Sequence, residues 1–597
     1  MALFTPSESP AVVVREIDLT GGVPNVQSTT GAIVGNFRWG PVLERTLVSN
    51  ETELVENFAS PSEDNAVDFL SATQFLRYSS SLQVVRNVDS NAQSAYSIQG
   101  ATGSVPDSNG AYTIDNPLIL SGTNFEQREA SLKAALDSDG TLGYGFVARF
   151  PGAVGNSIKV SYLPADSTGD VFNSWTYASS FDAAPSTSFF GSNNNITNDE
   201  MHIVVVDEDG AITGTRGEVL ETFPSVSVVR DAKNFEGQSV YALDVVNQAS
   251  QYVYFLNLDT ELEAKGAGAN TVSGTNYGLD SCVDRNISLA SGVNSGTLGT
   301  ADILEGFDLF EDKDQVEIDF LIAPSMNVRA DQTTVVNDLV TTARINRKDC
   351  MVVSSPARND IVGVTNDATK VSNAVTTANT FTNTSYLAID NNFLKVYDKY
   401  NDNYVFIPAA SSIAGIMAAT DFNRAPWFSP AGSRRGQLLG ITSLAYSPTK
   451  AQRDTLYKAD VNPIANIPGQ GAIMFGDKTA IGFPSAFDRI NVRRLFIVLE
   501  RAISRAAEQV LFEFNDEFTR AEFVNIVEPV LREVQGRRGI TDFRVVCDET
   551  NNTAAVIDRN EFKADIFIKP ARSINYVTLS FVAVRTGVDF EEVVGTV

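Results

Sequence analysis

The sequence has little of the side-chain chemistry on which most enzymes depend, because its 597 residues include one histidine and three cysteines. Any triad with a histidine base would have to use His202, which lies in a β-like run and is expected to be structural. Cys282, Cys350 and Cys547 lie far apart, so they form neither a disulfide framework nor a CxxC metal site. They favour a reducing compartment. We therefore expect no catalysis and no bound metal or cofactor.

The sequence also lacks long apolar runs. No stretch approaches the 18 or more apolar residues of a membrane-spanning helix. The first residues, Met1 to Pro6, lack the basic and apolar regions of a signal peptide. These absences predict a chain that is made in the cytoplasm and does not insert into a membrane.

Positive charge is scarce, and the formal net charge is −28. This balance argues against direct nucleic-acid binding, which depends on Lys and Arg. Residues 97–330 carry 32 acidic and 11 basic side chains, a net charge of −21, whereas 1–96, 331–479 and 480–597 carry −6, +2 and −3. The near-neutral blocks could pack against copies of themselves while the acidic block faces water. Alternatively, the blocks merely differ in composition.

Two segments look like ligand-binding motifs but depart from them. Gly471 to Thr479 resembles a phosphate-binding loop, but Asp477 lies before Lys478, breaks the spacing and adds a negative charge. Asp308 to Asp314 is acidic, but it lacks the glycine that an EF-hand loop needs. We expect neither segment to bind a ligand.

The pattern of apolar residues predicts an α/β core in two parts, separated by a β-rich block. Strands are expected at 32–35, 82–88, 319–324 and 350–354, and helices at 51–58, 65–78, 331–344, 408–419 and 449–459. Between the two parts, short β-like runs at 157–163, 202–206 and 252–258 predict antiparallel sheets, with a hairpin turn at 207–210.

The C-terminal stretch predicts a helix-plus-sheet domain. The longest helical pattern runs over 487–514, with an apolar side formed by Leu495, Phe496, Val498, Leu499, Ile503, Val510 and Leu511. A second helix over 516–534 is expected to bend or restart near Pro529. Strands are expected at 542–547, 561–569 and 575–585. The fold class is thus α+β and multidomain, an α/β core with inserted antiparallel β-rich domains, a C-terminal helix-plus-sheet domain and extended terminal arms.

Several segments resemble the tail sheath proteins of contractile-tailed, myovirus-type bacteriophages. They are Gly476-Asp477-Lys478-Thr479, Pro484 to Phe496, Phe543 to Asp548, Val556 to Phe562, Pro570 to Val577, Tyr397 to Asp402, Ser429 to Gly432 and Phe37 to Pro41. The resemblance covers roughly 20–90 and 320–597. It is weak between 97 and 330, and the chain looks shortened at about 97–140.

The resemblance implies a structural subunit of the virion that stacks as hexameric rings around a tail tube. Its contraction would drive the tube through the host cell envelope. The implied partners are copies of itself, the tail tube protein, and baseplate and tail terminator proteins. The implied domains are an N-terminal arm (1–20), a discontinuous α/β core (21–96 and 320–479), an acidic outward-facing insertion (97–319) and a C-terminal inner domain with an arm (480–597).

The same resemblance implies that residues near both termini link neighbouring subunits. Pro10 to Leu19 reads as a short strand that needs a sheet edge to join. We expect the arm residues to be Val12, Val13, Val14, Ile17, Phe581, Val582, Val584 and Phe590. Arginines of the 487–514 helix could contact an acidic tube surface, or they could form a solvated helix face with intrahelical ion pairs. They are Arg489, Arg493, Arg494, Arg501 and Arg505.

Two other classes of protein stay open. One is another structural protein of the virion, a baseplate or capsid component. The other is a carbohydrate-acting enzyme with the acidic block as its catalytic domain. A sheath predicts helical tubes, a capsid protein predicts closed shells, and an enzyme predicts turnover.

Overall fold

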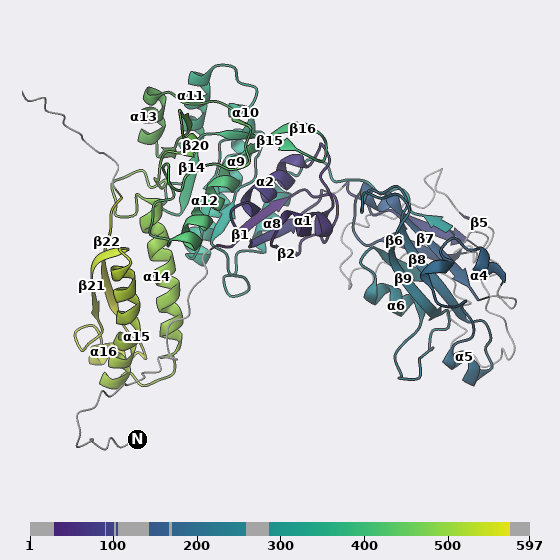
Figure 1. The fold of residues 1–597 in the computed structure, drawn as a ribbon. Helices are drawn as coiled ribbons and strands as arrows, with labels where there is room; N and C mark the ends of the chain where they lie inside the picture. Colours follow the sequence, from purple (N-terminus) through teal and green to yellow (C-terminus); the bar gives the residue numbers. More distant parts are fainter. Residues whose placement is uncertain are drawn as a thin grey trace, which may run out of the picture. The chain divides into compact units, whose positions relative to one another are not determined.

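A computed structural model describes most of the chain (Figure 1). The described residues are 29–89, 91–100, 103–104, 142–165, 170–257 and 286–573. They divide into two compact units. We call them the core unit, whose described residues lie within 27–423 and 430–490, and the C-terminal unit, whose described residues are 424–429 and 491–573.

A seven-stranded sheet forms the centre of the core unit, in the order β18-β14-β13-β12-β1-β3-β2. Its strands are β1 Gly31–Gly35, β2 Arg45–Val48, β3 Leu82–Arg86, β12 Phe320–Ile322, β13 Met351–Ser354, β14 Leu387–Asp390 and β18 Val461–Asn462. All neighbours are parallel except β2 and β3. Every residue of β1, β12, β13 and β14 is buried, as expected for parallel strands that are covered on both faces.

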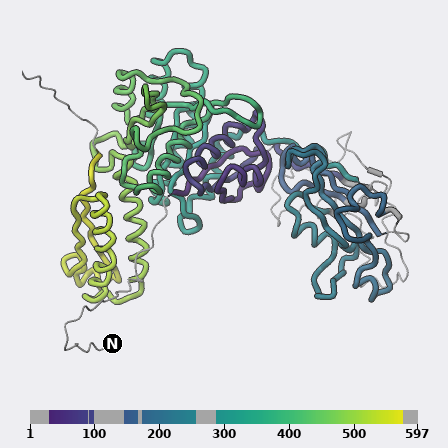
Figure 2. Tube along the Cα trace, in the orientation of Figure 1, coloured from purple at the N-terminus to yellow at the C-terminus, as the bar shows by residue number. Residues whose placement is uncertain are grey.

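Strands from the two separated α/β segments join in this one sheet. β1 pairs with β12, so that Gly31 lies opposite Phe320 although 289 positions separate them in the sequence. The strands coloured purple and teal to green therefore belong to the same sheet (Figure 2). The sequence predicted an α/β pattern on both sides of the β-rich block, and the strands and helices expected there are confirmed.

Helices cover this sheet. They are α1 Glu51–Phe58, α2 Ala66–Leu76, α8 Thr300–Asp308, α9 Arg329–Thr341, α10 Arg358–Ile361, α11 Asp367–Ala378, α12 Ala410–Asn423 and α13 Lys450–Lys458. α12 is made of small and apolar residues and packs against α2, β12 and β13, with Gly415 against the Tyr78 ring. α9 continues into one π-helical segment at Thr342–Arg347, where the buried Arg347 donates to the carbonyls of Phe310 and Val316.

Between β3 and α8 the described residues form two antiparallel sheets of four strands each, as the alternating pattern predicted. One contains β4 Tyr96–Gly100, β5 Gly103–Ser104, β6 Leu142–Ala148 and β10 Val253–Asn257. The other contains β7 Ile158–Pro164, β8 Glu200–Asp207, β9 Glu218–Ser227 and β11 Asn286–Ser288. The short helices of this part are α4 Asp170–Ser174, α5 Phe189–Asn194 and α6 Ala242–Ala249.

The hairpin expected at 207–210 is confirmed as β8–β9, with a connection that extends to 217. Asp207 organises it, because its buried carboxylate accepts hydrogen bonds from the backbone N–H groups of Gly210, Ile212 and Thr213 and from the Ser157 hydroxyl. These bonds lower the pKa of Asp207 although burial opposes them.

The C-terminal unit contains most of the long helix α14 Ile490–Glu508, together with α15 Glu517–Gly536, α16 Ala554–Ile557 and the antiparallel strands β21 Ile540–Val546 and β22 Asp565–Pro570. Its core joins apolar residues of α14 and α15 to the inner side of the two strands. The fully or nearly fully buried members are Trp427, Leu495, Leu499, Phe523, Val527, Leu531 and Ile540.

The bounds predicted for the first of these helices are corrected, and of the bend or restart expected near Pro529 in the second helix the restart is absent. α14 begins at Ile490 because the preceding residues are held in extended pairing, with Lys478 opposite Arg489, and it ends at Glu508 before Phe512, which has φ 72°. α15 does not restart at Pro529 but runs through it as one helix. Pro529 is exposed, so water can solvate the carbonyl that loses its N–H partner.

Candidate interaction surface

His202 lies inside the β7–β8–β9 sheet and is engaged on both ring nitrogens. Its Nε2 lies 2.7 Å from the Ala183 carbonyl, and its Nδ1 accepts a hydrogen bond from the Ser225 N–H at 3.0 Å. The ring stacks on Phe181 with centroids 4.2 Å apart. Burial lowers the pKa of His202, which favours the neutral ring. These contacts give His202 a structural role.

The segment that resembles a phosphate-binding loop is tied down by its own side chains. Lys478 Nζ donates to the Tyr457 carbonyl at 2.7 Å and to Asp460 Oδ1 at 2.9 Å. Asp477 pairs with Arg489 at 3.0 Å. Lys478, the lysine that would contact a phosphate, thus forms an internal ion pair. The segment links α13 to the start of α14.

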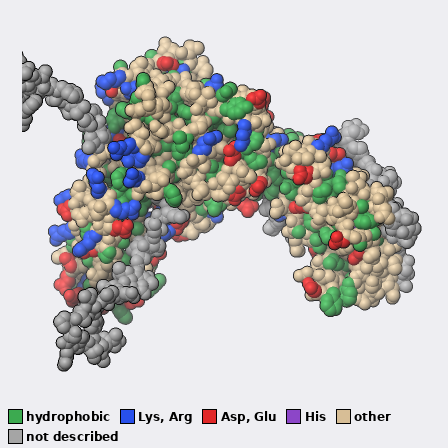
Figure 3. Space-filling view, in the orientation of Figure 1, with side chains coloured by type: hydrophobic (Ala, Val, Ile, Leu, Met, Phe, Trp, Pro, Cys, Tyr) green, Lys and Arg blue, Asp and Glu red, His purple; other side chains and the backbone are tan. Residues whose placement is uncertain are grey.

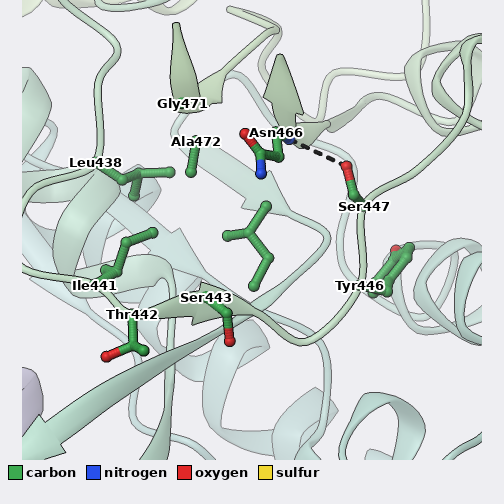
Figure 4. A pocket seen from close by; sticks show the side chains of 10 residues that line it. Leu438, Ile441, Thr442, Ser443, Tyr446, Ser447, Asn466, Gly471 and Ala472 are labelled. Atoms are coloured by element: carbon green, nitrogen blue, oxygen red, sulfur yellow. Dashed lines mark hydrogen bonds between the residues drawn. The ribbon is translucent and has the colours of Figure 1, made fainter. Parts of the chain in front are cut away.

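A pocket of about 420 Å³ lies in the core unit (Figure 4). Its lining residues come from the strands β17 Ser443–Leu444, β19 Ile464–Ile467 and β20 Gly471–Met474 and from the segments around them. They are Leu438, Ile441, Thr442, Ser443, Leu444, Tyr446, Ser447, Asn466, Gly471 and Ala472. The Tyr446 hydroxyl is bonded to Asn391, and no carboxylate, imidazole or amine belongs to this lining within the described residues. The Tyr446 hydroxyl, the one ionisable group among the described residues of this lining, is thus bonded within the protein.

Wider groupings of ligand-type residues are also missing from what the structure describes. Within those ranges, no three His, Cys, Asp or Glu side chains gather to hold a metal ion. No described helix combines the length and apolarity that a bilayer crossing requires.

The strongest candidate for function is the edge of the β21–β22 sheet in the C-terminal unit. Within residues 29–573, as far as the structure describes them, these two strands pair only with each other. β22 alternates between partly buried and exposed side chains, with Ile566 and Ile568 facing the core and Phe567 exposed at 59%. A two-stranded sheet with open edges can accept a further strand through main-chain hydrogen bonds.

The arm residues expected to supply such strands lie outside the described residues. This applies to Val12, Val13, Val14 and Ile17 near the N-terminus. It also applies to the C-terminal set, Phe581, Val582, Val584 and Phe590, and to the strand expected at 575–585. The linking role of both arms stays a prediction.

The arginines expected to reach a tail tube occupy three different environments. Arg489 precedes α14 and pairs with Asp477, while Arg493 and Arg494 are only 7% and 1% exposed. Arg501 and Arg505 are partly exposed. The contact of these five arginines with a tail tube stays a prediction.

A cluster of exposed aromatic residues was missed by sequence reasoning. Val510 and Leu511 were predicted to continue the apolar side of α14, but the helix ends at Glu508 and Leu511 is 61% exposed. Beside it in the sequence lie Phe512, Phe514 and Phe518, all more than 80% exposed. One signal in the sequence indicated that α14 ends before these residues. Asp516 is a good N-cap residue, and its side chain does accept a hydrogen bond from the Thr519 N–H, so a new helix starts there.

Comparison with known proteins identifies relatives along nearly the whole chain. Residues 296–480 match the family model for the phage tail sheath protein central domain, and residues 484–583 match the model for the phage tail sheath C-terminal domain. The chain is 32% identical to the tail sheath protein of Enterobacteria phage T4, with 98% of this chain and 99% of that protein covered. It is also 32% identical to the tail sheath protein of Vibrio phage KVP40, with the same coverage.

Solved structures agree on the fold. The sheath tail protein from Listeria innocua superposes with a TM-score of 0.52 at 10% identity, covering 92% of this chain and 97% of that one. The sheath tail protein from Desulfitobacterium hafniense gives a TM-score of 0.50 at 12% identity, covering 90% and 94%. The mixed α/β architecture with several sheets is therefore shared with these proteins.

Proposed function

The chain belongs to the phage tail sheath protein family, and from this premise we propose that it stacks as hexameric rings into a helical sheath around a tail tube. Members of this family are structural components of the virion. The observation that carries the proposal is the 32% identity to a tail sheath protein over 98% of the chain. Contraction of the sheath would then drive the tube through the host cell envelope.

We further propose that the terminal arms hold the subunits together by adding strands to the open β21–β22 sheet of neighbours. A strand of about six residues would form several main-chain hydrogen bonds, each worth about 0.5–1.5 kcal/mol net. Such bonds involve few side chains, so they can persist while the globular parts of neighbouring subunits shift during contraction. Among the described residues β21 and β22 pair only with each other, which supports this proposal.

Contraction in this proposal needs neither a cofactor nor catalysis by the sheath. The extended sheath is a metastable arrangement of subunits, and contraction releases free energy through newly formed interfaces. The subunit would be made in the host cytoplasm and would contact its own copies, the tube, the baseplate and the tail terminator. The −21 charge of residues 97–330 fits a part of the subunit that faces water.

Negative-stain electron microscopy of the purified protein at high concentration tests the assembly directly. We expect hollow, striated tubes. If the protein stays monomeric alone, the cognate tail tube should nucleate the same tubes. Closed shells, or monomers that ignore the tube, would refute the proposed sheath.

The role of the N-terminal arm is tested by a matched pair of variants. Val12→Pro, Val13→Pro and Val14→Pro together remove three backbone N–H donors, so this variant should stay folded and form no tubes. The control carries Val→Thr at the same three positions and keeps these donors. Normal tubes from the proline variant would refute strand exchange by this arm, and the sheath assignment would be unaffected.

A further inference from the structure

Exposed charges in the C-terminal unit separate to its two ends. We call one the acidic end, which lies at the end of α14, the start of α15 and the far end of the two strands. Its exposed carboxylates are Glu508, Glu513, Asp516, Glu517, Glu522, Asp548, Glu549 and Asp558. Three exposed cations lie at this end: Arg559 and Lys563 both pair with Glu561, and Arg544 lies near enough to Asp548 to lower the pKa of that carboxyl. The acidic end therefore presents a clear excess of negative charge.

The opposite end of the same unit is basic. The end of α15 lies there beside the start of β21 and the end of β22, because Ile540 pairs with Pro570 and the Ala571 N–H donates to the Gly539 carbonyl. We call this the basic end, and its exposed cations are Arg532, Arg537, Arg538, Lys569 and Arg572. Figure 3 shows Lys and Arg gathered towards one end of this unit and Asp and Glu towards the other.

The two ends are too far apart to neutralise each other within one subunit. α15 runs from the acidic end to the basic end, and its 20 residues give it a length of about 30 Å at 1.5 Å per residue. Screening at physiological salt has a length of about 8 Å, so each end acts as a separate charged surface. Some of the basic charge is already satisfied locally, because Arg532, Arg537 and Lys569 pair with Glu528, Glu533 and Asp542.

Two cations of the basic end have no carboxylate partner among the described residues. Arg538 and Arg572 form no ion pair with any described residue and are exposed. The carboxylates of Glu508, Glu513 and Glu549 likewise form no ion pair within the described part of the chain. Both ends thus have charge that a neighbour could complement.

The acidic end also carries exposed apolar side chains, which are those of Leu511 and of the aromatic residues Phe512, Phe514 and Phe518. Phe512 is fully exposed, and Phe514 and Phe518 are 82% and 85% exposed. Burying one such side chain is worth about 1.5–3 kcal/mol, so a cluster of this kind marks an interaction surface. Arginine guanidinium groups pack favourably on aromatic faces, and the basic end supplies them.

From this charge separation we propose that the acidic, aromatic end of one subunit binds the basic end of a second copy of the chain. This inference rests on the proposed sheath function and names one of its interfaces. The contact joins two different surfaces, so it is heterologous, and a repeated heterologous contact generates a ring or an open helix. A helical sheath needs such a contact, and attraction between opposite charges would favour the correct register.

The test uses two full-length variants, each of which disables one end. The first, Glu508→Lys with Glu513→Lys and Glu549→Lys, keeps a native basic end. The second, Arg538→Glu with Arg572→Glu, keeps a native acidic end. Each alone should need about tenfold or more protein to form tubes than the wild type. Mixed, they should associate at 1:1 stoichiometry in sedimentation velocity, because one native pair of ends remains and the reversed charges of the other pair are also opposite, and the association should weaken as salt rises.

A matched control separates this contact from a change in net charge. Glu218→Lys with Glu236→Lys alters two exposed carboxylates of the β-rich part and should assemble like the wild type. Glu→Gln at the three acidic-end positions provides a milder variant if the lysine variant does not fold by circular dichroism. It should weaken assembly in the same direction.

The outcomes distinguish this contact from the sheath function. Wild-type assembly by both disabled variants would overturn the contact and leave the sheath function intact. Loss of assembly in the acidic-end variant alone would also overturn it, because the acidic end would then bind the tube or an arm. If the wild type forms no tubes even with a tail tube, the sheath function fails. The presence or absence of the 1:1 association in the mixture still decides the contact.

Discussion

From the surroundings of Asp390 we predict an unusual dependence of the free energy of unfolding on pH. This carboxyl group lies at the end of β14 and is 1% exposed. It accepts hydrogen bonds from the Ser355 hydroxyl at 2.7 Å and from the Asn392 N–H at 2.9 Å. Burial raises its pKa to about 7, against an ordinary value of 3.8, and the two hydrogen bonds only partly oppose this rise.

The direction of this pH dependence follows from whether the folded or the unfolded protein binds the proton more tightly. Between pH 4 and 7 the folded protein keeps Asp390 protonated while the unfolded chain has released the proton, so stability falls as pH rises through this range. From pH 5 to pH 7 the loss is about 2 kcal/mol at 1.36 kcal/mol per pKa unit, because the group is half ionised in the folded protein at pH 7. The contribution is largest in the acid range and is lost by about pH 8.

Asp390→Asn removes the titration and keeps one acceptor for the Asn392 N–H. We expect the loss of unfolding free energy between pH 5 and pH 8 to be smaller by about 2–3 kcal/mol in this variant than in the wild type. Urea denaturation of dilute protein, followed by tryptophan fluorescence at both pH values, measures the difference. Asp454→Asn, on the exposed side of α13, is the control and should follow the wild type.

An identical pH dependence in Asp390→Asn and the wild type would refute this reasoning. It would mean that Asp390 is ionised in the folded protein, and hence that a cation or water reaches it. Asp68 provides an independent check, because it is partly buried and desolvation raises its pKa to about 6. Its contribution has the same sign and ends about one pH unit lower.

Three further predictions concern packing and buried hydrogen bonds. Arg86→Met removes the buried guanidinium that now donates to four backbone carbonyls, so we expect a loss of at least 3 kcal/mol and faster proteolysis of the β-rich part. Unchanged cleavage would contradict this role. Leu531→Ala, at 0% exposure, should cost about 2–5 kcal/mol and melt the C-terminal unit first in calorimetry, whereas Arg532→Ala should change little. Gly415→Ala places a Cβ 2.5 Å from the Tyr78 ring and should cost about 1–3 kcal/mol of overpacking; a neutral effect would mean that α12 can shift.

Much of the α/β sheet could be predicted from the sequence because its strands are buried on both faces. Ala32-Ile33-Val34 and Met351-Val352-Val353 read as continuous apolar runs, and such runs are typical of parallel strands. Helix starts were predictable where a side chain caps them, as Asn50 caps α1 and Thr449 caps α13. These signals are local, so one sequence suffices to detect them.

The features that sequence reasoning missed depend on residues far apart in the chain. Nothing in the sequence near Arg86 shows that its guanidinium donates to the carbonyls of Phe37, Gly40 and Pro151. The late start of α14 likewise depends on the pairing of Arg489 with Asp477. The burial of Arg493 and Arg494 could not be seen in a helical pattern that placed arginines on a solvated face.

The charge of the C-terminal unit shows why a segment total can mislead. Residues 480–597 have a net charge of −3, and the sequence alone presented them as a nearly neutral block suited to self-contact. Within the described residues 491–573 the fold separates opposite charges, because the hydrogen bond between Ala571 and Gly539 and the β21–β22 pairing place Arg538 and Arg572 at the same end of the unit, away from Glu513. A uniformly neutral surface would associate without a preferred direction. A polarised unit favours head-to-tail contact with the next copy, and this directionality is what a helical assembly requires.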